Sequence, residues 1–202
     1  MYFLYNIGLM KNILSLFFIV FLSSVSTLAA TEKQFIPVEE VQKSLKFFDE
    51  PKDVQKARIK AFKKTPPLPD VILEYEKKDK WHCYPANKSR PYPKFDIDGY
   101  KRNMTFFSEK TYCVYEYTST RVYYYDYNCN LVEYSKKDPL SFSDVWFNYN
   151  LDGELIKIFV DYKFKTYHFA PDGTLVGYWK FFNKYSPDGQ KVIMTRSRSP
   201  IY

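Results

Sequence analysis

The sequence predicts a mainly β protein, an antiparallel meander of tandem hairpins preceded by a short helical hairpin. The first observation is a turn that recurs as Asn-Leu-Asp-Gly at 150–153, Ala-Pro-Asp-Gly at 170–173 and Ser-Pro-Asp-Gly at 186–189. The second is that aromatic residues precede each turn, while Leu and a β-branched residue follow the first two. Because an Asp-Gly pair supplies positive φ at little steric cost, each unit is typical of a β-hairpin.

The first 30 residues have the three-part layout of a secretory signal peptide. Lys11 precedes an apolar run at 13–22, and small, weakly polar residues follow it. The strongly apolar part is shorter than the ~20 residues that span a bilayer, although a retained anchor stays open as an alternative. We expect residues 1–30 to be removed and the protein to be exported, periplasmic or extracellular, meeting the membrane only through this segment. Met1 and Met10 are both candidate start sites.

Residues 31–64 are predicted to form a helical hairpin. Apolar side chains recur at helical spacing in two stretches, Val38, Val41, Leu45 and Phe48, then Val54, Ala57, Ala61 and Phe62. Pro51 suits the first turn of the second helix. Residues 65–70, Thr-Pro-Pro-Leu-Pro-Asp, cannot extend a helix and form a Pro-rich connector.

Residues 71–202 are predicted to form the antiparallel β-repeat domain, since Tyr, Phe, Val and Ile occur there in short runs between turn residues. Alternation places three tyrosines on one side of 121–127, and an apolar core face at Ile156, Ile158, Val160 and Tyr162. Weaker turns are expected at 161–163 and near Lys180. A degenerate copy of the Asp-Gly unit is expected at 125–132, where Asn130 takes the place of Gly, and another at 96–99.

The repeated pattern, as in Tyr-His-Phe-Ala-Pro-Asp-Gly-Thr-Leu-Val at 167–176, resembles bacterial tandem β-hairpin repeats of the YD (RHS-like) and MORN-like kinds. Through Gly-Tyr-Trp at 177–179 it also resembles cell-wall-binding modules. The resemblance covers residues 121–192 and implies stacked hairpins. The Gly-Arg-Leu hallmark of YD repeats is absent, and Thr166-Tyr167 stands where wall-binding repeats have Trp. Only architecture is therefore carried over, and no binding residue.

The sequence contains no recognisable catalytic constellation. Its two histidines, His82 and His168, lie in no metalloprotease or hydrolase motif, and a cross-strand packing role is expected for His168. His82 and Cys83 are neighbours whose side chains point to opposite faces of an extended segment, which disfavours a nucleophile and base. The Asp residues of the three turns could suggest calcium, but turn geometry already requires them. We predict no catalytic residue, no metal and no cofactor.

A net charge of +7 is carried by Lys interleaved with Asp and Glu, which is typical of a solvated surface and gives no support to nucleic-acid binding. The predicted function is a non-catalytic envelope or secreted protein that binds a surface polysaccharide or a protein partner through a Tyr-rich sheet face. The candidate residues, each just before a turn, are Tyr125, Tyr149, Tyr167 and Tyr185. If they face the core instead, they only pack.

Two other classes stay open. One is a secreted hydrolase that works through carboxylates such as Asp126 or Glu154, although an enzyme is the less favoured class because paired carboxylates need a pocket. The other is a purely structural accessory protein of the envelope.

The cysteines Cys83, Cys113 and Cys129 all follow the predicted signal peptide, so a disulfide is permitted and one thiol is left over. Three pairings are possible. Because Cys113 lies in a strand run and Cys129 at a turn, the sequence favours Cys83 with Cys113.

Overall fold

The computed structural model describes residues 35–72, 83–95, 105–108, 112–115, 120–137 and 144–198. The chain divides into two compact units, Met1–Phe35 and Ile36–Tyr202, and every described helix and strand belongs to the second. The predicted signal peptide, His82 and the predicted turn at 96–99 lie outside the described residues.

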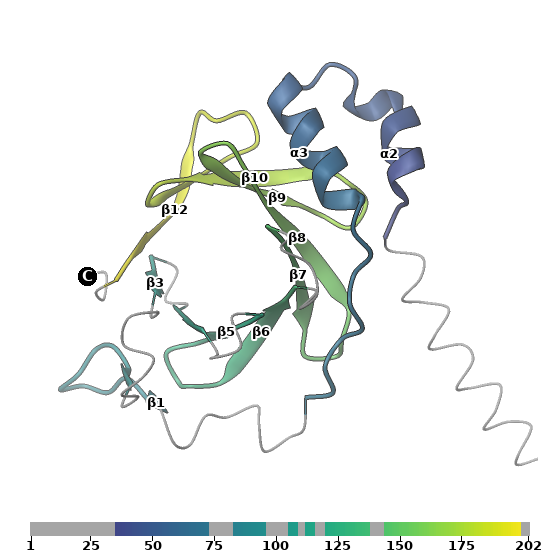
Figure 1. Cartoon of the computed structure of the whole chain (residues 1–202). Coiled ribbons are helices and arrows are strands. Elements are labelled where there is room, and N and C mark those ends of the chain that lie inside the picture. The colour runs from purple at the N-terminus through teal and green to yellow at the C-terminus, as the bar shows by residue number, and fades with distance from the viewer. Residues whose placement is uncertain are drawn as a thin grey trace, which may run out of the picture. The chain divides into compact units, whose positions relative to one another are not determined.

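Ten antiparallel strands of the described chain form one curled sheet, in which each strand pairs with the next along the chain (Figure 1). Their bounds are β3 Thr105–Phe107, β4 Tyr112–Tyr115, β5 Arg121–Tyr125, β6 Leu131–Lys136, β7 Val145–Asn150, β8 Leu155–Tyr162, β9 Lys165–Phe169, β10 Leu175–Lys180, β11 Asn183–Tyr185 and β12 Val192–Ser197. The last strand pairs with the first through Arg196 opposite Phe107 and Ser197 opposite Phe106, which closes the sheet into a barrel. The predicted antiparallel meander is confirmed.

The Asp-Gly turns have the predicted geometry. Gly153, Gly173 and Gly189 have φ of 82°, 81° and 76°, and each donates its backbone N–H to the carbonyl oxygen three residues earlier. The degenerate copy needs a correction, because Cys129 rather than Asn130 takes the glycine position, with φ 64° and an N–H bond to the Asp126 carbonyl.

The two weaker turns are also present. Lys163 and Phe181 have positive φ between β8 and β9 and between β10 and β11, each within a two-residue connection. Each interval between Asp-Gly turns therefore holds two strands, as the spacing predicts.

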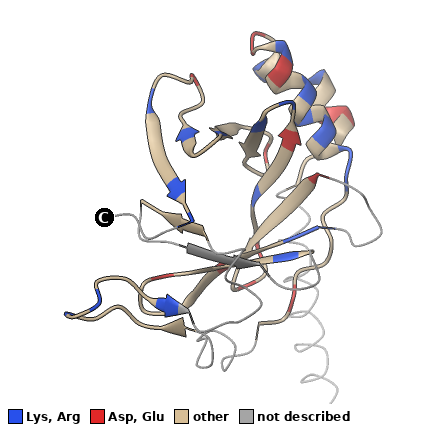
Figure 2. Ribbon diagram, turned by 60° about the vertical axis from the view of Figure 1, so that its left-hand side comes forward, with Lys and Arg blue, Asp and Glu red and all other residues tan. Residues whose placement is uncertain are grey.

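The helical segment consists of α2 Val38–Lys43, a 3₁₀ turn η1 Leu45–Phe47 and α3 Lys52–Phe62. Pro51 stands at the N-cap of α3, one residue before the position expected for it. Both α-helices carry acidic residues in the first turn and a basic residue in the last turn, and α3 is mainly basic (Figure 2). None of the described helices is both long and apolar enough to cross a membrane.

Helix α3 packs on the outer face of β8 and β9. Its apolar side, with Ala57, Ala61 and Phe62 buried, lies against that face, and the Phe62 ring meets Phe169 edge-on at 6.3 Å between centroids. The apolar outward residues of β8, Ile158 and Val160, are fully buried. The core face predicted for β8 is therefore the outside of the barrel.

Arg58 ties this helix to an Asp-Gly turn. Its guanidinium is buried, donates to the Gly173 carbonyl oxygen at 2.6 Å and to Glu50, and lies 3.8 Å from the centre of the Phe47 ring. A Cβ at Gly173 would lie only 3.1 Å from this ring, in addition to the strain of its positive φ. Burial is the largest cause that lowers the pKa of the Arg58 guanidinium, and the Glu50 carboxylate acts in the opposite direction.

The Pro-rich connector, residues 65–70, contacts side chains of β5, β6 and β7 on the outer face of the barrel. Tyr149 donates its hydroxyl to the Pro67 carbonyl, and the Tyr134 hydroxyl accepts the Asp70 N–H at 2.7 Å. The Asp70 carboxylate also binds Arg121 at 2.7 Å and Lys136 at 2.6 Å. These contacts hold the connector because a segment rich in Pro cannot pair as a strand and must satisfy its carbonyls through side chains.

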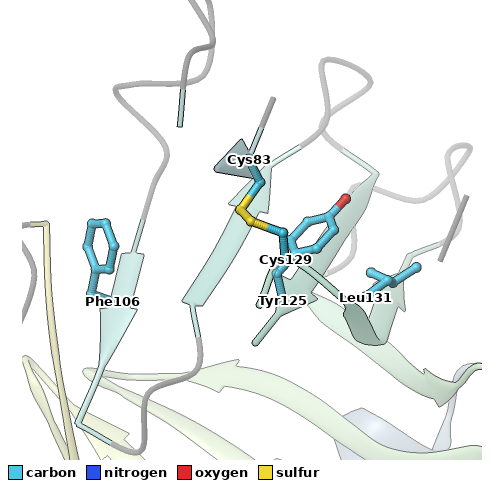
Figure 3. Close-up of a cluster of buried hydrophobic side chains, with 5 residues drawn as sticks. All are labelled: Cys83, Phe106, Tyr125, Cys129 and Leu131. Carbon is cyan, nitrogen blue, oxygen red and sulfur yellow. A yellow bond between two sulfur atoms is a disulfide. The ribbon is translucent and has the colours of Figure 1, made fainter. Parts of the chain in front are cut away.

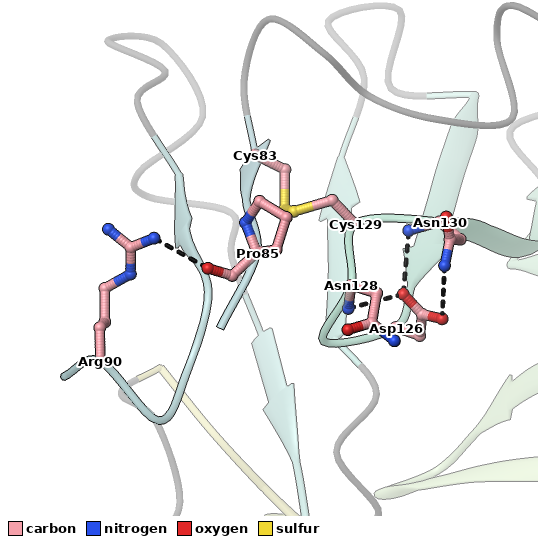
Figure 4. Close-up of a disulfide and its surroundings, with 7 residues drawn as sticks. All are labelled: Cys83, Pro85, Arg90, Asp126, Asn128, Cys129 and Asn130. Atoms are coloured by element: carbon pink, nitrogen blue, oxygen red, sulfur yellow. Dashed lines mark hydrogen bonds between the residues drawn. A yellow bond between two sulfur atoms is a disulfide. The ribbon is translucent and has the colours of Figure 1, made fainter. Parts of the chain in front are cut away.

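A two-stranded hairpin, β1 Cys83–Tyr84 and β2 Lys94–Phe95, is joined to the barrel by a disulfide between Cys83 and Cys129 (Figures 3 and 4). The predicted Cys83–Cys113 pairing is therefore wrong. The turn at 126–130 is covered by the 83–95 segment, whose Ala86 N–H bonds the Tyr127 carbonyl at 3.0 Å, so its position at a turn does not keep Cys129 from pairing. Cys129 is completely buried there in a small apolar cluster with Tyr125 and Leu131 (Figure 3).

Candidate functional site

Residues on the inside of the barrel line a partly open cavity of about 560 Å³. Its lining includes five aromatic side chains, Phe107, Tyr124, Trp146, Phe159 and Trp179. It also includes five charged side chains, Glu133, Lys157, Asp161, Lys184 and Arg196. A volume in the range of ligand pockets, with flat apolar surfaces and a few charges, can hold a small molecule.

Strand alternation explains why this lining is mixed. In β8 the residues Lys157, Phe159 and Asp161 face inward, while Ile158 and Val160 between them face α3. The register of β7 with β8 places Trp146 opposite Phe159, so the two large rings share the inner face. The same strands therefore bury their aliphatic side outside and present their polar and aromatic side to the cavity.

Several inner polar groups are paired with one another. Lys157 forms an ion pair with Glu133 at 3.1 Å, and Ser135 donates its hydroxyl to the Asn148 side-chain oxygen at 2.8 Å. The Asn148 amide nitrogen is buried and has no hydrogen-bond partner among the described residues. A buried amide N–H without a partner is costly, so this position is unfavourable for the stability of the inner face.

His168 is a buried titratable group in the wall of the cavity. Its side chain is buried, its ring lies 4.1 Å from that of Phe159, and its Nδ1 has no hydrogen-bond partner in the described part of the chain. Burial is the largest cause that lowers the pKa of His168 well below 6.5, followed by the charges of Lys184, Lys157 and Arg196. The imidazole is therefore neutral at pH 7 and offers one donor and one acceptor nitrogen.

The predicted packing of His168 across the hairpin agrees with its register, since it stands opposite Phe159. Its position in the cavity wall was not predicted, because the pairing of β8 with β9 does not reveal that the sheet closes.

Two cations stand on the strands that complete the barrel. Lys184 on β11 is buried to the same degree as Phe159. The Arg196 guanidinium on β12 lies 4.8 Å from the Trp179 ring and donates from Nε and Nη2 to the Phe181 carbonyl oxygen. Neither residue belongs to a sequence motif, and alternation along β11 is the one local signal that separates Lys184 from its neighbours Asn183 and Tyr185.

The four tyrosines predicted to bind a partner do not form a solvent-exposed strip. Tyr125, Tyr149 and Tyr167 are 8%, 2% and 2% exposed, and Tyr185 is half-buried and stacked on Tyr178. Tyr149 also stacks on Tyr134 at 5.5 Å, and burial raises the pKa of both phenols, that of Tyr134 to about 12. In this structure the packing alternative therefore holds for Tyr125, Tyr149 and Tyr167.

The carboxylates considered for hydrolysis are engaged in two separate turns. Asp126 accepts the backbone N–H groups of Asn128 and Asn130 (Figure 4), and Glu154 accepts the Asn150 side-chain amide at 2.7 Å. Across the described residues, no group of three or more His, Cys, Asp or Glu side chains is close enough to hold a metal ion.

Comparison of the chain with protein-family models, with curated proteins and with solved structures finds no match. The resemblance to tandem hairpin repeats therefore stays a prediction, and the argument for function rests on the cavity.

Proposed function

We propose that this protein is an exported, non-catalytic binding protein that holds a small ligand inside its barrel. The observation that carries the proposal is the cavity of about 560 Å³, with Trp146, Phe159 and Trp179 in its wall. Aromatic rings provide a large contact area at a low cost in side-chain entropy. Barrels of more than eight strands leave interior room that side chains alone do not fill.

The arrangement of carboxylates favours binding over hydrolysis. Glu133 is held by Lys157, and Asp161 accepts a hydrogen bond from Thr166. Lys157, which holds Glu133, and Asp161 lie on the same strand. They are four residues apart, which is about 13 Å along the strand axis at the usual rise. The two acids of the lining are thus engaged in separate contacts, whereas glycoside hydrolysis needs two carboxyl groups that flank one bond.

The neutral fluorescent compound N-phenyl-1-naphthylamine tests the cavity directly. We expect one molecule per chain to bind to the mature protein with a micromolar Kd, with energy transfer from tryptophan to the probe. Two of the three tryptophans, Trp146 and Trp179, line the cavity. Replacing both Thr105 and Thr166 by Phe narrows the cavity and should abolish binding.

A control variant removes the exposed aromatic residues of the hairpin tips, Phe164→Ser, Phe181→Ser and Phe182→Ser, which are 88%, 72% and 66% exposed. This variant should bind the probe as the parent does. Binding that survives the cavity variant and disappears in the tip variant would place the probe on the surface and refute the proposal. If the Phe pair fails to fold, as judged by circular dichroism, the Kd of Trp146→Ala for the probe, read from directly excited probe fluorescence, decides the same question, because this change removes one ring of the lining.

Export is supported by the apolar run at 13–22 and by the Cys83–Cys129 disulfide, since disulfides persist in oxidising compartments. Intact-mass analysis of the protein recovered from its host checks this part. A species that still begins at Met1 or Met10 would contradict it.

A further inference from the structure

We propose that the ligand of the barrel is an anion, a small carboxylate, sulfonate or phosphate joined to an aromatic or apolar body. This inference rests on the proposed binding function and specifies the ligand chemistry of the same cavity.

The charges of the lining favour a negative guest. Lys157, Lys184 and Arg196 line the cavity against two acids, Glu133 and Asp161. Glu133 is matched by Lys157 in the 3.1 Å ion pair, and Asp161 lies towards the β8–β9 turn with Thr166. Strands β11 and β12 contribute two cations, Lys184 and Arg196, and no acid to the lining, so the lining holds three basic and two acidic side chains.

His168 shares the cavity wall with the three basic side chains of the lining. The three charges that act on its ring are those of Lys184, Lys157 and Arg196, all positive. Its buried Nδ1 lacks a partner among the described residues although it lies in the cavity wall. A buried polar atom without a partner is rare in folded proteins, and a bound ligand is one way to satisfy it. In one tautomer Nδ1 donates a proton, which an anionic oxygen accepts well.

The apolar part of the ligand follows from the rings beside these cations. Trp179 lies under the Arg196 guanidinium, and Phe159 lies against His168. A flat apolar group in contact with these rings would bring a charged substituent within reach of Arg196 and Lys184. A cationic guest would instead enter a site that already holds two or more like charges, which disfavours it.

A matched pair of probes separates this inference from the proposed function. 8-Anilinonaphthalene-1-sulfonate is N-phenyl-1-naphthylamine with one sulfonate added, so the two differ by the anionic group alone. We expect the sulfonate to bind about tenfold more tightly than the neutral probe, since a charge-assisted hydrogen bond in a partly buried site has this effect. The preference should decrease as salt rises.

Charge-removing variants identify the residues responsible. Lys184→Met and Arg196→Met should each weaken sulfonate binding about fivefold to tenfold more than they change binding of the neutral probe, because only the sulfonate loses a charge-assisted contact. The controls are Lys180→Met and Lys191→Met, which remove exposed lysines that do not line the cavity. The Phe164, Phe181 and Phe182 serine variant is assayed alongside, so that binding of the sulfonate to exposed rings is measured separately.

The outcomes are distinct. If the neutral probe binds inside the barrel and the sulfonate binds no better, the ligand is not selected by negative charge; the binding function stands and this inference fails. If the cavity variants and surface controls lower sulfonate binding equally, the preference is a property of net charge, which also overturns it. If neither probe enters the barrel, the proposed function itself fails.

Discussion

The two faces of the barrel wall are built from the same strands but differ in what covers them. The outer face of β6 to β9 carries fully buried apolar residues such as Phe147, Ile158 and Phe169, under α3 and the Pro-rich connector. The inner face carries charged residues and rings around a cavity, with polar atoms of Asn148 and His168 lacking a partner in the described chain. The stabilising core and the candidate binding site thus lie on opposite faces of the same sheet.

This difference shows that a closed sheet does not have to bury its most apolar face inside. The N-terminal segments supply the cover: the helices dock through Arg58 and the connector through Asp70. Because the outer face provides the dry core, the interior is free to hold water or a ligand. Function and stability are therefore expected to respond to different substitutions.

The largest expected effect is on the outer face. Tyr149→Ser combined with Tyr167→Ser removes two buried rings, and large-to-small changes of this kind cost about 3–5 kcal/mol each when the cavity does not collapse. Urea unfolding and thermal melts of the double variant measure the loss. Tyr162→Ser, at a half-buried position of β8, is the matched control and should cost much less.

A double variant that keeps most of the parent stability would show that the outer face is not the core, and the comparison between faces would fail. Tyr149→Phe tests the contact with the connector alone, because this change removes only the hydroxyl that donates to the Pro67 carbonyl. Its expected cost is about 1 kcal/mol.

The second effect concerns the disulfide, which joins the 83–95 segment to the turn before β6. Cys83 and Cys129 are 46 residues apart, and a cross-link over a loop of this size stabilises by about 4 kcal/mol in the chain-entropy account. Urea unfolding should therefore show a free energy of unfolding that is about 4 kcal/mol lower in the Cys83→Ser, Cys129→Ser variant than in the parent. Thiol titration of the denatured parent should find one free thiol per chain, and three would show that the bond is not formed.

The smallest effect is a pH dependence that belongs to the inner face. His168 stays neutral in the folded protein, because its pKa is lowered by burial and by Lys184, Lys157 and Arg196, whereas in the unfolded chain it protonates near 6.5. Below that pH the unfolded state binds the extra proton, so stability falls as the pH falls from 6.5 towards the folded pKa.

The expected slope from His168 is about 1 kcal/mol per pH unit. It should be measured as the difference between the parent and His168→Gln over pH 7 to 5. Parallel pH profiles of the two proteins would mean that His168 is solvated rather than buried in the cavity wall.

Local chemistry made much of the fold predictable. Asp-Gly pairs set the turns, the alternation of Ile156, Ile158 and Val160 with Lys157, Phe159 and Asp161 set the faces of β8, and Pro51 marked the boundary before the second helix. These features depend on neighbours in the sequence, where steric rules and side-chain direction act directly. The position of Cys129 in its turn was misjudged because a non-glycine residue with positive φ carries no sequence signal.

The candidate site was not predictable in the same way. The sequence by itself determined that the protein is a meander of hairpins with one apolar face per strand. Only the tertiary structure decided that this face points outward, because the cover comes from residues 36–70, and that β12 pairs with β3. Closure depends on contacts between residues far apart in the chain, and closure brings Lys157, His168, Lys184 and Arg196 into the wall of one cavity.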